Sequence, residues 1–196
     1  MAQLQILPDP PKVAQAAAGI VVAGARRAAA EGRTFSLVLS GGSTPKILYQ
    51  LLAADPYRAR IEWPSVEIYF GDERAVPPDH PDSNFKMANE ALLSRVPLRP
   101  DYVHRMRGEI DPNQAAIEYG QMLKTRFGDA GPDVTLLGMG DDGHTASLFP
   151  YSPAVSETRH RCVAQFVEKS TTGKSWRITL TAPFLNRSVK ILVRRR

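Results

Sequence analysis

Short apolar runs alternate with longer amphipathic runs along this chain. Runs of about four to eight apolar residues that end in glycine or polar residues are typical of buried strands. Such runs occupy residues 35–40 (FSLVLS), 66–72 (VEIYFGD) and 133–140 (DVTLLGMG). Two further β-rich segments follow at 161–168 and 176–193. We therefore expect at least five segments with strand character.

The amphipathic runs predict helices between these strands. The first is alanine-rich and stops near Gly32, and the second begins with Pro45, a residue favoured in the first turn of a helix. The third is capped by Ser83. The four predicted helices cover residues 12–32, 45–53, 83–96 and 113–127. Alternation of strand and helix predicts an α/β fold with a mostly parallel, Rossmann-like sheet and helices on both faces.

Length and composition are those of a soluble globular protein. The 196 residues fit a single domain, 1–196, and 43% of them are hydrophobic and 23% charged. The net charge of +5 includes the last three arginines, 194–196, and without them it is 5 − 3 = +2. No other basic run carries interspersed aromatic residues, so we expect no nucleic-acid partner, whereas small anionic substrates suit this charge.

The single cysteine and the N-terminal segment suggest a cytoplasmic protein. Cys162 has no partner for an internal disulfide, and it excludes a cysteine-rich metal site. The N-terminus lacks the basic segment of a secretory signal. The apolar run 13–25 is shorter than the roughly 20 residues that span a bilayer, so we expect no membrane partner.

Three polar, glycine-containing loops follow the predicted strands. Their sequences are SGGSTP (40–45), GDERAVPPDHPDSN (71–84) and GMGDDGHTASLFP (138–150). In open α/β sheets ligands bind beyond the carboxyl ends of the strands. Three such loops in one sheet therefore indicate a site that they share.

The first loop has the residues of a phosphate site. Gly41 and Gly42 let the backbone turn, and Ser43 and Thr44 offer hydroxyl and amide groups where the next helix begins. The alternative is a capped turn without a ligand. The loop is not a Walker A motif, because no Gly-Lys-Ser/Thr follows at the required distance.

The second loop brings charged residues to the end of a strand. Arg74 is suited to bidentate contact with a phosphate group, and Asp72 could orient a water molecule or a sugar hydroxyl. The alternative interpretation is a loop held by local salt bridges.

The third loop contains Gly-x-Gly-x-x-Gly, the spacing of a dinucleotide-binding turn. Asp141 and Asp142 stand between these glycines and would face a pyrophosphate dianion. An acidic residue about 20 positions later, which would hold a ribose, is also missing. A dinucleotide site is therefore disfavoured.

Hydrolysis suits the third loop better. His144 can accept a proton from water near neutral pH, and Asp142 can fix its tautomer and stabilise the imidazolium. The alternative is a histidine whose hydrogen bonds are satisfied by the loop backbone. No metal site is expected, because the other histidines lie in unrelated segments. No Gly-x-Ser-x-Gly motif supports a serine nucleophile.

Four segments together resemble the glucosamine-6-phosphate isomerase/6-phosphogluconolactonase family. They are LSGGSTPKILYQLLA, YFGDERAVPPDHPDSNFKMANEALL, LLGMGDDGHTASLFP and WRITLTAPFLN, in the family's order, and they cover roughly residues 35–186. After Asp-Gly-His the deaminases of this family continue with Phe-Asn-Glu-Pro, whereas this chain reads TASLFP. The resemblance is therefore to the lactonase branch.

The resemblance implies a NagB/RpiA/CoA-transferase-like fold and hydrolysis of 6-phospho-D-glucono-1,5-lactone in the oxidative pentose phosphate pathway. It implies no cofactor. His144 would be the base, Asp142 would orient it, and Asp72 would hold water or a sugar hydroxyl. Arg177 would be a second anion contact, unless it pairs within the sheet. The phosphate would lie on Gly41, Gly42, Ser43, Thr44 and Arg74.

The C-terminal residues depart from the family pattern. Family members continue past the strand that matches VKILV into a glycine-containing loop, a lysine and a last helix, whereas this chain continues with three arginines. We expect weaker substrate binding and an exposed apolar patch as a result. A non-catalytic sugar-phosphate-binding protein and a glucosamine-6-phosphate deaminase or isomerase remain as alternatives, and both monomer and homodimer are open.

Overall fold

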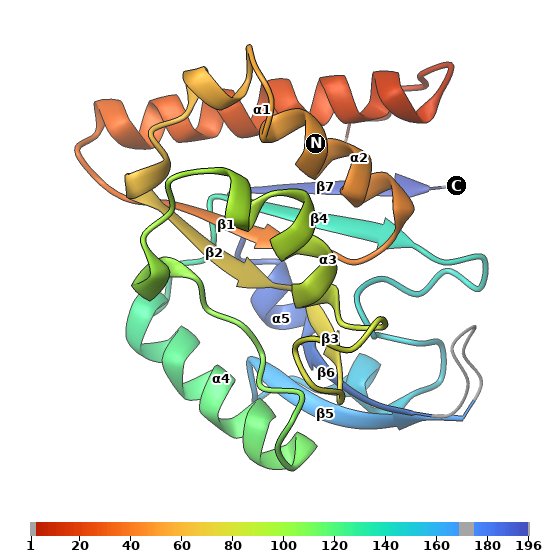
Figure 1. The fold of residues 1–196 in the computed structure, drawn as a ribbon. Helices are drawn as coiled ribbons and strands as arrows, with labels where there is room; N and C mark the ends of the chain where they lie inside the picture. Colours follow the sequence, from red (N-terminus) through yellow and green to blue (C-terminus); the bar gives the residue numbers. More distant parts are fainter. Residues whose placement is uncertain (1–2, 169–174, 196) are drawn as a thin grey trace.

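A four-stranded parallel sheet lies at the centre of the molecule. The computed structural model describes residues 3–168 and 175–195. Helices α1 and α2 cover one face of the sheet, and α4 and α5 lie on the other side (Figure 1). The strand order is β2-β1-β4-β7, and every neighbouring pair is parallel. The four strands are β1 (Phe35–Leu39), β2 (Val66–Phe70), β4 (Val134–Met139) and β7 (Lys190–Arg195).

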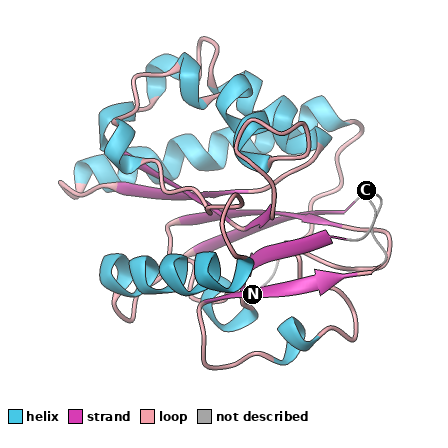
Figure 2. Cartoon of the chain, turned by 60° about the horizontal axis from the view of Figure 1, so that its bottom comes forward, coloured by secondary structure: helices cyan, strands magenta, loops and turns pink. Residues whose placement is uncertain are grey.

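A three-stranded antiparallel sheet forms a second unit below the first. Its order is β3-β6-β5, with the strands β3 (Asp72–Arg74), β5 (Cys162–Val167) and β6 (Ser175–Leu180). Figure 2 shows the strands of both sheets between the upper helices and a lower helix. The expected α/β fold with a parallel sheet and helices on both faces is confirmed, and this second sheet adds to it.

Two predicted strand segments are divided in the structure. The run 66–72 was expected to be one strand, but Gly71 separates β2 from β3, which belongs to the other sheet. The amide of Gly71 donates to the carbonyl of Leu39 (2.8 Å), and its own carbonyl accepts from the amide of Leu180 (2.9 Å). Gly71 therefore pairs with one strand of each sheet. The β-rich segment 176–193 likewise contains a short helix, α5 (Ala182–Leu185), between β6 and β7.

Helix α1 (Pro10–Ala30) packs closely on the first strand. The side chain of Asp9 accepts a hydrogen bond from the amide of Lys12 (2.8 Å) and caps the helix. A Cβ atom at Gly24 would lie 2.8 Å from the ring of Phe35, so glycine permits this close approach. The helix ends before Gly32, which has a φ of +67°.

Helix α2 (Ser43–Leu52) begins two residues earlier than the sequence predicted. Its N-cap is Gly42, with a φ of +108°, and no side chain caps this end among the described residues. Ser43 and Thr44 therefore belong to the first turn of the helix, and Pro45 is not its first residue. The amides of this turn are oriented toward the loop that follows β1.

The remaining helices have clear caps. Ser83 caps α3 (Asn84–Ala91) as predicted, but this helix ends before the predicted residue 96 and is followed by a 3-10 turn. Asp111 caps α4 (Pro112–Phe127) by accepting from two backbone amides (each 3.0 Å). The hydroxyl of Tyr119 accepts from the amide of Phe70 at the end of β2 (2.9 Å), which ties α4 to the parallel sheet.

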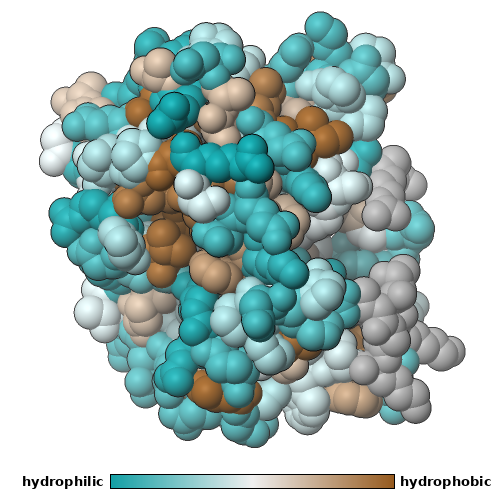
Figure 3. Space-filling view, in the orientation of Figure 1, coloured by the Kyte–Doolittle hydropathy of each residue, from teal (hydrophilic) through white to brown (hydrophobic). Residues whose placement is uncertain are grey.

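The core lies on both faces of the parallel sheet. Every residue of β1 and β2 is buried, as expected for a central strand pair covered by helices. The surface in Figure 3 is mainly hydrophilic, with hydrophobic residues gathered to the left of α3. Val189, just before β7, is 61% exposed, and Val193, within β7, is 51% exposed. Within the described residues no helix combines the length and the apolar character needed to cross a membrane.

Candidate functional site

The three predicted loops lie at one edge of the parallel sheet. Strand β1 lies between β2 and β4, and all three run in the same direction. The loops that follow them therefore leave the sheet at its carboxyl edge, where ligands of such folds bind.

The Gly41–Gly42 turn is packed tightly against the second loop. A Cβ atom at Gly41 would lie only 2.0 Å from Oδ1 of Asn84, so no larger residue fits there without moving Asn84. The carbonyl of Ser40 accepts from the buried hydroxyl of Tyr49, which also accepts from the Ser40 amide (2.8 Å each). This turn presents the uncapped start of α2, which is a favourable place for an anion.

Asp72 is held from two directions. Nδ2 of Asn84 donates to the carbonyl of Asp72 (2.9 Å) and to its Oδ1 (3.3 Å). The hydroxyl of Ser147 donates to Oδ2 of Asp72 (2.7 Å). Asp72 therefore connects the second loop to the third.

Arg74 lies directly opposite Arg177 in the antiparallel sheet. They are cross-strand partners of β3 and β6, and Arg177 is only 4% exposed. Burial lowers the pKa of Arg177, and the charge of Arg74 lowers it further. The carboxylates of Asp72, Asp82 and Glu73 act in the opposite direction and raise it. Like charges at directly opposed positions repel, so an anion between the two guanidinium groups would be attracted to both.

Asn84 orients Arg74. Nη1 of Arg74 donates to Oδ1 of Asn84 (2.8 Å) and to the carbonyl of Asp82 (2.6 Å). Its Nε is buried and has no hydrogen-bond partner in the described part of the chain. Because Asn84 also touches Gly41, it places the Arg74 guanidinium beside the Gly41–Thr44 turn.

His144 and Asp142 form a close pair. Nδ1 of His144 lies 2.5 Å from Oδ1 of Asp142, which also accepts from the His144 amide (3.1 Å). Burial opposes ionisation of Asp142, but these hydrogen bonds from His144 outweigh it and hold the pKa of Asp142 below its usual value. The ring of Phe149 stacks on the imidazole, with 4.2 Å between the ring centroids.

The loop backbone accommodates the imidazole. The amide of Gly140 donates to the carbonyl of His144 (2.8 Å), and Gly143 has a φ of +85°. A Cβ atom at Gly140 would lie 2.3 Å from Nδ1 and Cε1 of the imidazole, so a side chain there would displace it. Gly140 therefore leaves room for the imidazole, and Gly143 allows the turn that precedes His144.

This arrangement favours a basic Nε2 on His144. An ionised Asp142 beside Nδ1 selects the tautomer that carries its hydrogen on Nδ1. The lone pair of Nε2 is then available to accept a proton. The His144 side chain remains 30% exposed, so solvent reaches it.

The third loop does not have the structure of a dinucleotide-binding turn. A helix should follow the glycines and direct its N-terminus at the pyrophosphate. In the structure the next helical element after β4 is the short 3-10 turn Pro153–Ser156. This context removes the main support for the dinucleotide interpretation.

Four polar residues of this site were not predicted from the sequence: Gln165, Ser147, Thr179 and Asn84. Gln165 donates from Nε2 to the carbonyl of Ser147, and the hydroxyl of Thr179 accepts from the Ser147 amide (3.2 Å). Both stand on the face of the antiparallel sheet that carries Arg177. Asn84, the fourth missed residue, contacts Asp72 and Arg74. Only Thr179 had a signal in the sequence, because polar residues occupy every second position of β6.

The predicted residues are only partly connected by direct contacts. Hydrogen bonds link Asp72 to the loop of His144 and link Asn84 to Arg74. Among the described residues no hydrogen bond joins Ser43 or Thr44 to His144. No group of three histidine, cysteine or acidic side chains in the described ranges is arranged to hold a metal ion.

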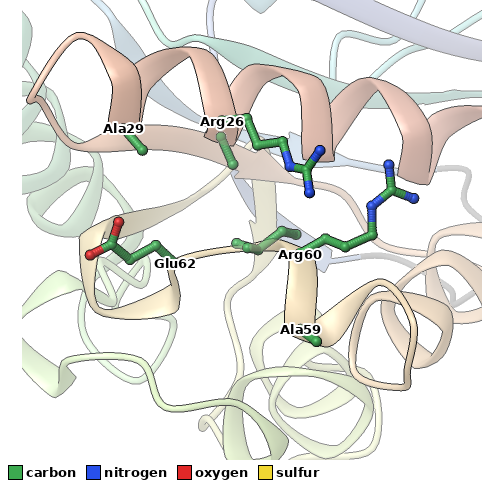
Figure 4. Close-up of a pocket in the computed structure, with 7 residues that line it drawn as sticks. Arg26, Ala29, Ala59, Arg60 and Glu62 are labelled. Atoms are coloured by element: carbon green, nitrogen blue, oxygen red, sulfur yellow. The ribbon is translucent and has the colours of Figure 1, made fainter.

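Two hollows elsewhere on the surface do not belong to this edge. The first, shown in Figure 4, lies between α1 and residues 59–62, and the side chains of Arg26 and Arg60 lie on the same side of it. Ala29 and Glu62 in its wall precede β1 and β2, so it lies at the amino edge of the sheet. The other is lined by α3 and the segment after it.

Comparison with known proteins identifies the family. Residues 8–194 match the family described as glucosamine-6-phosphate isomerases/6-phosphogluconolactonase. The chain belongs to this family. A 6-phosphogluconolactonase of Nostoc is 37% identical over 198 residues, which is 96% of this chain and 78% of the relative. The 6-phosphogluconolactonase of Mycobacterium tuberculosis is 40% identical over 200 residues, with the same coverage.

Solved structures of family members have the same fold. The 6-phosphogluconolactonase of Trypanosoma brucei superposes with a TM-score of 0.86 at 31% identity, covering 97% of this chain and 80% of that one. A monomeric glucosamine-6-phosphate deaminase superposes almost as well, with a TM-score of 0.85 but only 19% identity. The fold is therefore common to both branches, whereas the sequence is nearer to the lactonases.

Proposed function

We propose that this protein hydrolyses 6-phospho-D-glucono-1,5-lactone to 6-phosphogluconate. The observation that carries the proposal is the 2.5 Å contact between His144 and Asp142 at the edge where the Gly41–Thr44 turn also lies. Relatives that are 37% and 40% identical over nearly the whole chain bear the name 6-phosphogluconolactonase, which supports this choice of substrate.

His144 is the general base of this reaction. Its Nε2 takes a proton from water as the water oxygen attacks the lactone carbonyl carbon. The bond between that carbon and the ring oxygen then breaks, and the imidazolium returns the proton to the ring oxygen. Asp142 stabilises the imidazolium that exists between these two steps. Water is the only co-reactant, and the product is an acid with a free hydroxyl.

The Gly41–Thr44 turn and the arginine pair bind the phosphate. Amides at the start of α2 donate to its oxygens, and Arg74 supplies a counter-charge beside them. Arg177 is the second cationic contact, since it lies directly across from Arg74. These groups hold the lactone so that the attack on its carbonyl becomes effectively intramolecular.

Asp72 positions groups at the centre of the site. Its Oδ1 and Oδ2 each accept one hydrogen bond, from Asn84 and Ser147, and a carboxylate oxygen can accept two. The remaining capacity is available to a sugar hydroxyl or to the attacking water.

The test measures lactone opening and ligand binding separately. Lactone is produced from glucose 6-phosphate, acid release is followed by pH, and the spontaneous rate is subtracted. His144→Gln should lower kcat roughly 100- to 10,000-fold and leave 6-phosphogluconate binding within about twofold of the original value. His160→Gln, an exposed histidine outside this site, is the matched control and should retain full activity.

Three outcomes would contradict parts of this proposal. Unchanged hydrolysis by the His144 variant would refute the base assignment. Saturable binding of 6-phosphogluconate without hydrolysis by the unmodified protein would instead indicate a sugar-phosphate-binding protein. Release of ammonia from glucosamine 6-phosphate would place the chain with the deaminases.

A further inference from the structure

Arg194 lies at the carboxyl edge of the parallel sheet. It is the partner of Gly138 in the register of β7 with β4, just before the loop that carries His144. Nη1 of Arg194 donates a hydrogen bond to the hydroxyl of Thr44. Figure 1 shows the end of β7 beside the start of α2.

This contact joins segments that are distant in the sequence. Strand β4 lies between β1, which leads into α2, and β7. The Arg194 side chain therefore crosses the end of β4 to reach the first turn of α2. Thr44 is 7% exposed, and Arg194 is half-buried, so the guanidinium is held at this place and does not extend freely into solvent.

None of the described carboxylates neutralises the charge of Arg194. Within the described residues no carboxylate lies in ion-pairing distance of its guanidinium, and the hydroxyl of Thr44 is its only side-chain acceptor. A guanidinium has five N–H donors in a fixed plane and keeps its charge at every physiological pH. Its unused donors lie beside amides that also favour an anion.

We propose that Arg194 is a phosphate contact that makes this protein selective for phosphorylated lactones. The proposal rests on the proposed function and deepens it. Arg74 and Arg177 approach the phosphate from the antiparallel sheet, and Arg194 approaches it from the parallel sheet. The phosphate is thus held between arginines of both sheets, and Thr44 fixes the position of Arg194.

The experiment compares substitutions of two cations of β7. Arg194→Gln removes the charge at the carboxyl edge, Arg194→Lys keeps it, and Lys190→Gln removes a charge from the exposed opposite end of the same strand. Rates are measured with 6-phosphogluconolactone and with unphosphorylated gluconolactone. Affinity for 6-phosphogluconate and for gluconate is measured by calorimetry, and thermal unfolding checks that each variant is folded.

Arg194→Gln should weaken 6-phosphogluconate binding and raise KM for the phosphorylated lactone, each by about tenfold or more. Its kcat and its rate with gluconolactone should stay within about twofold of the original values. Arg194→Lys should recover much of the loss, and Lys190→Gln should change none of these quantities.

Equal losses for phosphorylated and unphosphorylated ligands would overturn the proposal, as would equal effects of the two glutamine substitutions. The affinity for 6-phosphogluconate tests the phosphate contact independently of whether the protein opens the lactone. If the unmodified protein opened no lactone, loss of 6-phosphogluconate affinity in Arg194→Gln alone would still support the phosphate contact, and unchanged affinity would refute it.

Discussion

The hydroxyl of Ser147 donates a 2.7 Å hydrogen bond to the carboxylate of Asp72. Ser147 belongs to the loop of His144, whereas Asp72 is the first residue of β3. Gln165 and Thr179 hold the backbone of Ser147 from the neighbouring strands. The imidazole therefore depends for its position on the antiparallel sheet, although its loop leaves the parallel one.

Ser147→Ala should lower both stability and turnover. The substitution removes the donor to Oδ2 of Asp72, and the free energy of unfolding should fall by about 1 kcal/mol. Because the change loosens the loop of His144, kcat should fall more than KM rises. Thermal unfolding and steady-state kinetics measure the two effects. Ser94→Ala, an exposed serine bonded to the carbonyl of Asn89, is the control; a variant of Ser147 with unaltered kcat would contradict this role.

Gly41→Ala should impair phosphate binding through a steric clash. The new Cβ would lie 2.0 Å from Oδ1 of Asn84, which is the acceptor for Arg74. Displacing Asn84 should cost about 1–3 kcal/mol of stability and raise KM without a matching fall in kcat. Gly19→Ala is the control, since a Cβ there meets nothing within 4 Å and alanine should stabilise α1 by about 1 kcal/mol. Equal KM values in the two variants would show that the turn tolerates a side chain.

Asp142→Asn should lower kcat while leaving ligand affinity intact. The amide can still accept from Nδ1 of His144, but it no longer supplies the negative charge that stabilises the imidazolium. We expect kcat to fall roughly 10- to 100-fold, less than for a buried carboxylate, because the Asp142 side chain is 51% exposed. Single-turnover rates and 6-phosphogluconate calorimetry separate the two quantities. Full activity of this variant would mean that the pair does not assist catalysis.

Acid should destabilise the fold partly through Glu157. This carboxylate accepts from the amides of His160 (3.0 Å) and Arg159 (2.6 Å), and these bonds, with the His160 side chain, lower its pKa to about 2. A lowered folded-state pKa means that the unfolded chain binds the proton more readily. The stabilisation is therefore present above pH about 4.5 and is lost as the pH falls toward about 2.

The pH dependence of unfolding tests this assignment. Glu157→Gln should lower the melting temperature at pH 7. The difference in melting temperature between this variant and the original protein should become smaller as the pH falls below about 4.5. A difference that stays constant from pH 7 to pH 3 would show that the hydrogen bonds do not act through the charge of Glu157.

Local sequence patterns predicted the loops but not their connections. Apolar runs and caps such as Ser83 identify strands and helices because these signals are contained in a few neighbouring residues. The pairing of His144 with Asp142 is equally local, since they are two positions apart. Ser147 and Asn84 could not be predicted as parts of the site, because their partners are set by tertiary packing.

The division of the sheets was invisible in the sequence for the same reason. VEIYFGDER reads as one strand with a polar end, and nothing in it indicates that the last residues pair with β6. The early start of α2 depends on the φ of +108° at Gly42, which the prediction from Pro45 did not include. The roles of Arg74 and Arg177 in binding the phosphate stay predictions.

The passage of the chain through Gly71 has a mechanical consequence. A single residue separates strands that belong to different sheets, and its amide and carbonyl are each fixed to one of them. A ligand held, as we propose, by the start of α2 and by the Arg74–Arg177 pair would span this joint. Binding of such a ligand would then favour the angle between the two sheets at which both contacts are made.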